Sequence, residues 1–192
     1  GIFVGNSPSG SLGNPGNLSG CAEKTIVFPI IAPAENVPGT QYIINFGDGE
    51  SVTYIHPNAP ASVSHTYNIS SCGNLPTGSG NIANSFVASM TITNPCFPAA
   101  FTTVSPIIIN TPPTPNFTVN NKGCINNIIN LTNTSILGSV ISASGCVSNP
   151  TFYWEISPAS GWSAVGLGTN GGNATDIDFW TSGSNTPTIT FN

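Results

Sequence analysis

The stretch "YIINFGDGESVTYIHPNAPASVSHTY", residues 42–67, decides the fold of this chain. Alternate residues of its opening strand, 41–46, are predicted to face a core. The tripeptide Gly47-Asp48-Gly49 then predicts a tight turn, because glycine adopts the unusual φ that the turn needs and aspartate bonds nearby backbone amides. Residues 51–56 and 62–67 are predicted to continue as two further strands.

The same pattern of strands and turns runs through the first half of the chain. Short β-branched and aromatic runs alternate with clusters of Gly, Pro, Asn and Ser, and no stretch shows sustained helical periodicity. Strands are predicted at residues 2–4, 25–30, 41–46, 51–56, 62–67, 86–93 and 101–109. Seven short strands in about 110 residues predict an immunoglobulin-like β-sandwich.

A proline-rich connector, residues 110–115, predicts a boundary between two domains, 1–111 and 112–192. Three prolines in four residues favour a stiff, extended connector. Strands of the second half are predicted at residues 116–119, 128–132, 152–156, 161–165, 176–180 and 188–191. This half lacks counterparts of the last two strands of the first. We therefore expect its sandwich to be completed by sequence beyond residue 192 or by another subunit.

Charge is the unusual feature of the composition. Only 5% of the residues are charged, with two lysines, no arginine and a net charge of −5. Nucleic-acid binding and attachment of a surface helix to membranes both need basic side chains, so both partner classes are excluded. No apolar run approaches the roughly 20 residues of a membrane span. A polar surface of Asn, Ser, Thr and Gly, together with five cysteines, predicts an extracellular protein.

The five cysteines predict disulfides, with one cysteine left over. Chain direction alternates in a sandwich, which places Cys21 and Cys72 at the same end of the first domain. We therefore favour the pairs Cys21–Cys72 and Cys124–Cys146, with Cys96 unpaired. Pairing of Cys96 with Cys21 or with Cys72 remains an alternative.

Acidic and histidine side chains in the opening stretch raise the question of catalysis. Asp48, helped by Glu50, could act as a general acid or base, but the flanking glycines favour a role in closing the turn. His65 is predicted as a buried imidazole that faces the same side as Tyr67 and bonds to the turn. His56 and His65 have no third ligand at a zinc-binding spacing. We predict no catalytic residue.

Calcium is the metal that the sequence would favour, since extracellular modules bind it through oxygen ligands. The candidate pairs are Asp48 with Glu50 and Asp176 with Asp178. Neither pair lies in a run that resembles an EF-hand loop, so the interpretation as solvated turn and strand residues is preferred. We predict no cofactor.

Tryptophans offer the remaining candidate for a binding surface. Trp154 is predicted to lie in the core of the second domain, whereas Trp162 and Trp180 lie nearer to strand ends. Aromatic side chains exposed there could form a platform for a carbohydrate. No Gly-x-Ser-x-Gly elbow and no phosphate-binding loop accompanies them.

The segments 42–49 and His65-Thr66-Tyr67 together resemble the polycystic-kidney-disease (PKD) domain family. That family carries a Tyr-x-Trp-x-Phe-Gly-Asp-Gly strand and turn and a later His-Thr-Tyr; here Ile44 stands at the tryptophan position. The likeness covers about residues 20–109 and is weaker in the second half. There Trp154 keeps the tryptophan position but Ser157-Pro158-Ala159-Ser160-Gly161 replaces the turn.

Further segments resemble the PKD-type repeats of very large surface adhesins in gliding bacteria that use type IX secretion: "GNPGNLSGC", "HPNAPASVSHTYNISSCG", "TNPCFPA" and "WEISPASGW". The resemblance implies a non-catalytic module on the bacterial cell surface, in tandem with neighbouring repeats of the same long chain and in contact with surface polysaccharide or other cell-surface proteins. Two alternatives are a carbohydrate-binding region of a secreted hydrolase and a subunit of a self-assembling extracellular fibre.

Overall fold

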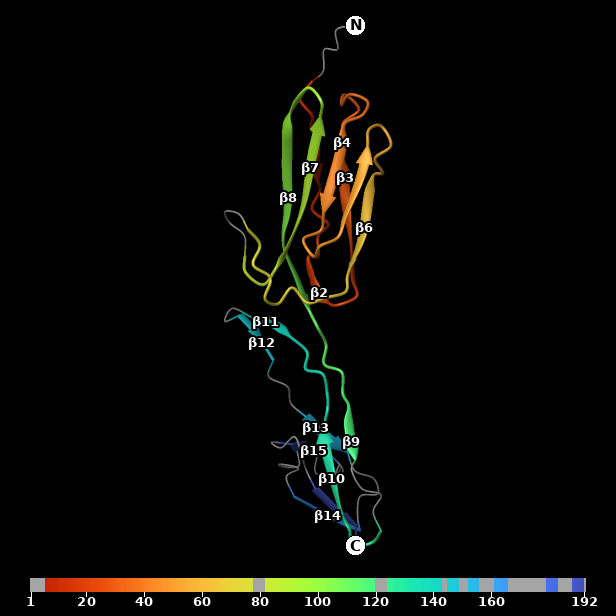
Figure 1. Ribbon diagram of the computed structural model, residues 1–192, viewed down its shortest axis with the longest axis vertical. Coiled ribbons are helices and arrows are strands. Elements are labelled where there is room, and N and C mark those ends of the chain that lie inside the picture. The colour runs from red at the N-terminus through yellow and green to blue at the C-terminus, as the bar shows by residue number, and fades with distance from the viewer. Residues whose placement is uncertain are drawn as a thin grey trace. The chain divides into compact units, whose positions relative to one another are not determined.

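The structure is a computed structural model, and it is all-β, as the sequence predicts. It describes residues 6–77, 82–119, 124–142, 145–148, 152–155, 161–165, 179–182 and 188–191. Within these ranges the chain forms sixteen strands and no helix (Figure 1). None of the described segments is therefore a helix that could cross a membrane. The predicted strand at residues 2–4 lies outside the described residues.

The chain divides into two compact units that differ from the predicted domains in one respect. Unit 1 comprises Gly1–Pro112 and Ser139–Val147, and unit 2 comprises Pro113–Gly138 and Ser148–Asn192. The first division falls beside the predicted boundary, inside the proline-rich connector. The segment Ser139–Val147, however, returns to unit 1, although the predicted boundary assigns it to the second domain.

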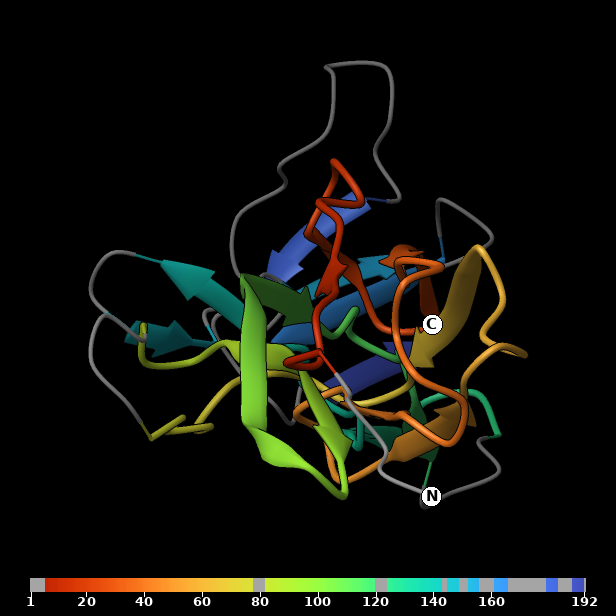
Figure 2. The same cartoon turned by 90° about the horizontal axis from the view of Figure 1, so that it is seen from above.

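Unit 1 is built from two main sheets around one core. The smaller sheet has the order β1-β3-β6 and the larger has the order β2-β8-β7-β4-β5. The smaller sheet contains β1 (Ser11–Leu12), β3 (Lys24–Ile31) and β6 (Ser62–Tyr67). The larger sheet contains β2 (Ser19–Cys21), β4 (Gln41–Asn45), β5 (Ser51–Ile55), β7 (Phe86–Asn94) and β8 (Phe97–Asn110). Figure 2 shows these strands from above; the green β7 and β8 lie on the opposite side of unit 1 from the gold β6.

Side chains of both sheets meet in the core because polar and apolar positions alternate along the strands. In β7 every second residue from Phe86 to Ile92 is buried, and in β4 Tyr42 and Ile44 are fully buried. Phe28 of β3 and Tyr67 of β6 enter the same core from the smaller sheet. These contacts are consistent with a β-sandwich.

Neighbouring strands of unit 1 are antiparallel except at one edge. There β2 runs parallel to the end of β8, with Ser19 opposite Ile108. The returning segment of unit 1 forms a hairpin of β11 (Val140–Ser142) and β12 (Gly145–Val147). Each strand of this hairpin is three residues long. The short strands β1, β2, β11 and β12 were not predicted from the sequence.

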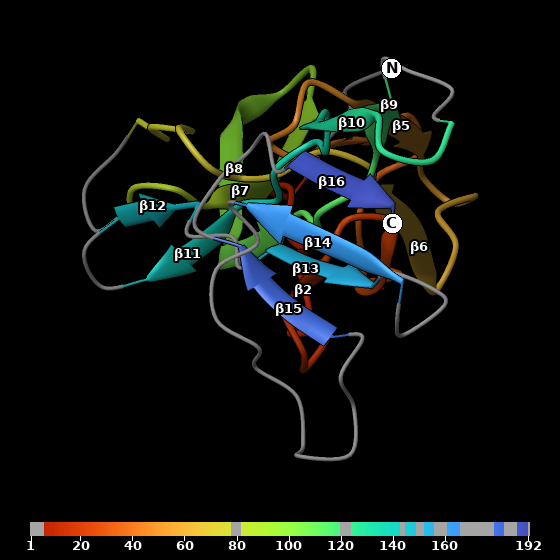
Figure 3. The ribbon, with the colours of Figure 1, turned by 90° about the horizontal axis from the view of Figure 1, so that it is seen from below.

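Unit 2 contains a sheet of the order β14-β16-β10-β9 and a separate pair, β13 with β15. The sheet is formed by β9 (Phe117–Val119), β10 (Ile128–Asn133), β14 (Trp162–Val165) and β16 (Thr188–Phe191), and the pair by β13 (Phe152–Glu155) and β15 (Phe179–Ser182). Figure 3 shows β14 and β16 side by side. Among its described residues, Leu131 and Ile189 are the buried apolar side chains. Completion of this unit from outside the chain stays a prediction.

Candidate functional site

The turn between β4 and β5 holds the acidic candidates. Gly47 and Gly49 have φ values of 88° and 104°, a region that favours glycine. The Gly47 amide donates to Asn45 Oδ1 at 2.8 Å, and the Glu50 amide donates to Asp48 Oδ1 at 3.1 Å. The turn therefore has the conformation that the Gly-Asp-Gly pattern predicts, with the aspartate side chain bonded to its own backbone.

Gly47 also lies against the neighbouring strand β7. A Cβ atom placed on Gly47 would lie 2.6 Å from the Val87 carbonyl oxygen and 2.8 Å from the Val87 nitrogen. A Cβ placed on Gly49 would meet no atom within 4 Å. The first glycine is thus needed for both its conformation and its close packing, whereas the second is needed for its conformation alone.

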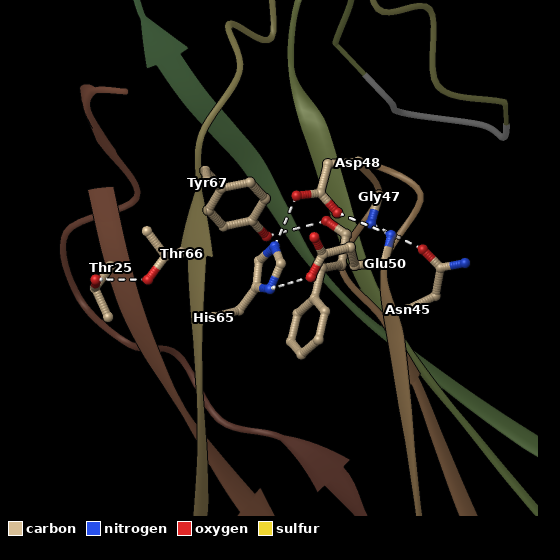
Figure 4. Close-up of polar contacts among 9 residues, drawn as sticks. Thr25, Asn45, Gly47, Asp48, Glu50, His65, Thr66 and Tyr67 are labelled. Carbon is tan, nitrogen blue, oxygen red and sulfur yellow. Dashed lines mark hydrogen bonds and ion pairs between the residues drawn. The ribbon is translucent and has the colours of Figure 1, made fainter. Parts of the chain in front are cut away.

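Asp48 joins the turn to the opposite sheet through His65. His65 Nε2 lies 2.7 Å from Asp48 Oδ2, and the exposed fractions of these side chains are 5% and 6% (Figure 4). His65 is in β6, and Asp48 follows β4 of the larger sheet. This buried pair therefore connects the two sheets of unit 1.

Aromatic rings enclose the imidazole of His65. The ring of Phe46 stacks on it, with centroids 3.9 Å apart and planes 3° from parallel, and Tyr67 meets it edge-on at 4.6 Å. The second ring nitrogen, Nδ1, lies 3.7 Å from Oε2 of Glu50, whose side chain is 72% exposed. Both nitrogens thus face carboxylates. The contacts of the described residues fix the ring; they do not direct it at a hydroxyl or thiol nucleophile.

Tyr67 completes the cluster from the core side. Its hydroxyl donates to the Phe46 carbonyl oxygen at 3.0 Å, and its side chain is fully buried. Burial raises the pKa of Tyr67 well above its ordinary value, and the negative charge of Asp48 raises this pKa further. The phenol therefore keeps its proton and donates a hydrogen bond to the backbone beside the turn.

A pH dependence follows from this raised pKa. The unfolded chain releases the Tyr67 proton as the pH rises through 10, while the folded chain keeps it. The unfolded state then binds fewer protons, so the stabilisation by this group is complete below pH 10 and falls above it, by at most about 1.4 kcal/mol per pH unit. Urea unfolding between pH 8 and 11 measures the slope. We expect Tyr67→Phe to reduce it, and Tyr54→Phe in β5 to leave the contribution of Tyr67 intact.

The structure does not bring the two histidines together. His56 follows β5, so the five residues of that strand, about 16 Å, separate it from the turn that contacts His65. His56 Nδ1 lies 3.3 Å from the hydroxyl of Tyr42. That hydroxyl also accepts from Asn36 Nδ2 at 2.7 Å, so His56 belongs to a separate polar group.

The candidate calcium ligands occupy different environments. Asp48 uses one carboxylate oxygen for His65 and the other for the Glu50 amide, and Glu50 is mostly exposed. In the part of the chain that the structure describes, no three His, Cys, Asp or Glu residues form a metal-binding group. Asp176 and Asp178 lie outside the described residues, so the structure tests neither a calcium site there nor the preferred interpretation as solvated strand residues.

The proposed tryptophan platform can be placed only in part. Trp162 begins β14, is half-buried, and lies opposite Phe191 of β16. Trp180 lies in β15 opposite Trp154 of β13, but the positions of both side chains are outside the description. A carbohydrate platform formed by Trp162 and Trp180 remains untested.

The disulfide of the structure differs from both predicted pairs. Cys72 is bonded to Cys146, with 5.6 Å between their Cα atoms, while Cys21, Cys96 and Cys124 are free and exposed. The predicted pairs Cys21–Cys72 and Cys124–Cys146 are therefore wrong. They assumed that each half of the chain bonds only to itself.

The returning segment of unit 1 is the physical reason for this correction. Ser139 pairs with Thr111, and its hydroxyl lies 2.8 Å from the hydroxyl of Ser70. The Ile141 amide donates to Asn110 Oδ1 at 2.9 Å. These bonds place the hairpin with Cys146 beside the loop with Cys72. No local sequence pattern signals this return.

Neither a scan against protein-family models nor a search of curated proteins gives a match for the chain. The resemblance to PKD repeats therefore rests on the residues that carry it.

Proposed function

We propose that the chain is a non-catalytic structural module of a large extracellular adhesin or filament. The observation that carries this proposal is the buried pair of Asp48 and His65. These side chains could perform acid–base chemistry, but here each is used to hold a turn of one sheet against a strand of the other. A residue with this role stabilises a module without acting on a substrate.

The same contacts support a PKD-type, immunoglobulin-like identity for unit 1. If unit 1 is a PKD-type domain, the Phe-Gly-Asp-Gly and His-Thr-Tyr segments occur together in such domains because their side chains are in contact. Phe46 stacks on His65, Asp48 binds His65, and Tyr67 donates to the backbone of Phe46. Three pairwise contacts thus link two sequence segments that lie on opposite sheets.

The outward faces of unit 1 carry little charge, which suits a protein that contacts water and neighbouring modules. Outward residues of β4 and β5 are uncharged, and Thr25 of β3 is bonded to Thr66 of β6 through their hydroxyls at 2.8 Å. Such faces have little attraction for polyanions. They favour a spacer or attachment role over charge-driven binding.

Antibodies raised against the 192-residue chain test the proposal on its source cells. We expect them to bind intact cells, and protease added outside to remove that signal while a cytoplasmic marker protein stays whole. On immunoblots the reactive protein should be much larger than the 19.7 kDa of this chain. A reactive species of about 19.7 kDa, protected inside intact cells, would contradict the proposal.

A further inference from the structure

The disulfide between Cys72 and Cys146 closes a large loop in the chain. The bonded cysteines are 74 residues apart in sequence. The loop contains β7, β8 and β11 of unit 1, the proline-rich connector, and β9 and β10 of unit 2. Strands β1 to β6 precede the loop, and β13 to β16 follow it.

A covalent loop changes the route of a pulling force. When a chain is pulled at its two ends, tension follows the shortest covalent path between them, since backbone and disulfide bonds both resist extension. Here that path runs along the backbone to Cys72, crosses the sulfur–sulfur bond to Cys146, and continues through Val147 toward the C-terminus. Residues 73–145 lie outside this path.

We propose that the Cys72–Cys146 disulfide carries tension past the proline-rich connector and past strands β7 to β11, so that a pulling force does not extend them. The stiff, proline-rich connector therefore does not contribute to the stretched length of the oxidised chain, although its position between the two units suggests that it would. The path is a property of the covalent structure, whereas its use by a cell rests on the proposed function as an extracellular adhesin or filament.

The length hidden by the loop is large. With 74 residues at roughly 3.3–3.6 Å per extended residue, reduction of the disulfide should release about 250 Å of chain. Cys146 is exposed, so a reductant can reach its sulfur. Dithiothreitol supplies the two electrons and two protons that convert the bond into two thiols, and is itself oxidised to a cyclic disulfide. The chain is therefore extensible by different amounts in oxidising and reducing surroundings.

Single-molecule stretching of the full 192-residue chain, held at its two ends, tests the inference. We expect the fully stretched oxidised chain to be shorter than the dithiothreitol-treated chain by about 250 Å. Stretching reads covalent length after unfolding, so a variant that folds poorly can still be measured once its oxidation state is known from peptide mapping. Equal stretched lengths before and after reduction would overturn the inference.

Single cysteine variants identify the bond that carries the tension. Cys72→Ser and Cys146→Ser should each give the full reduced length without reductant, while Cys96→Ser and Cys124→Ser should keep the oxidised length. If the bridges were instead Cys21–Cys72 and Cys124–Cys146, Cys72→Ser would release only part of the hidden length. That outcome would overturn the assigned path. It would leave the proposed extracellular function untouched, because the antibody experiment tests that function separately.

Discussion

Replacing Gly47 with alanine is expected to be among the most damaging single changes in unit 1. The residue has a φ of 88°, which costs an L-residue about 1–2 kcal/mol. Its new Cβ would also lie 2.6 Å from the Val87 carbonyl oxygen, an overlap of the kind that costs about 1–3 kcal/mol. Together these costs should lower the free energy of unfolding by about 2–5 kcal/mol, as measured by urea unfolding.

Gly49→Ala is the matched control for this change. Its φ of 104° carries a similar conformational cost, but a Cβ there would meet no neighbouring atom. We expect a loss of only about 1–2 kcal/mol. Equal losses for the two variants would show that the close approach of Gly47 to β7 does not contribute.

Removal of the Asp48 carboxylate should have an effect of similar size. Asp48→Ala would leave His65 buried without its partner and the Glu50 amide without its acceptor. Breaking a buried ionic or strongly polar pair from one side costs about 3–5 kcal/mol, so we expect a loss near the lower end of this range in urea unfolding. Glu50→Ala, which removes an exposed side chain 3.7 Å from the ring, should cost less than about 1 kcal/mol.

A double-mutant cycle with His65→Ala separates this pair from its surroundings. If Asp48 and His65 stabilise unit 1 through each other, the double variant should lose less than the sum of the single variants, by about 0.5–3 kcal/mol. Additive losses would mean that the two residues act independently. The link between the sheets would then reside in the stacking of Phe46 on His65 instead.

The features that could be predicted from the sequence are local ones. Alternation along β4 and β7 identifies their buried faces, and the Gly-Asp-Gly pattern identifies the turn. Proximity of His65 to that turn was also predicted, because a histidine on the inward face of a strand needs a polar partner. Each of these inferences depends on a few consecutive residues and on general stereochemistry.

The features that could not be predicted depend on contacts between residues that are far apart in the sequence. Contact of Gly47 with Val87 arises only after β4 and β7 pair. Likewise, the pairing of Thr111 with Ser139 brings Cys146 to Cys72, and these residues carry no pattern that distinguishes this match from other cysteine pairs. The parallel contact of β2 with β8 is equally remote from any local signal.

The return of Ser139–Val147 to unit 1 also determines when that unit can be finished during synthesis. A chain leaves the ribosome with its N-terminus first. Cys72 must therefore wait for 74 more residues before its partner emerges. By then β9 and β10 have already been made. A gene fragment that stops at Pro112 would encode most of the unit 1 core but leave Cys72 as an unpaired thiol; one that extends through Val147 is the shortest that encodes the whole unit.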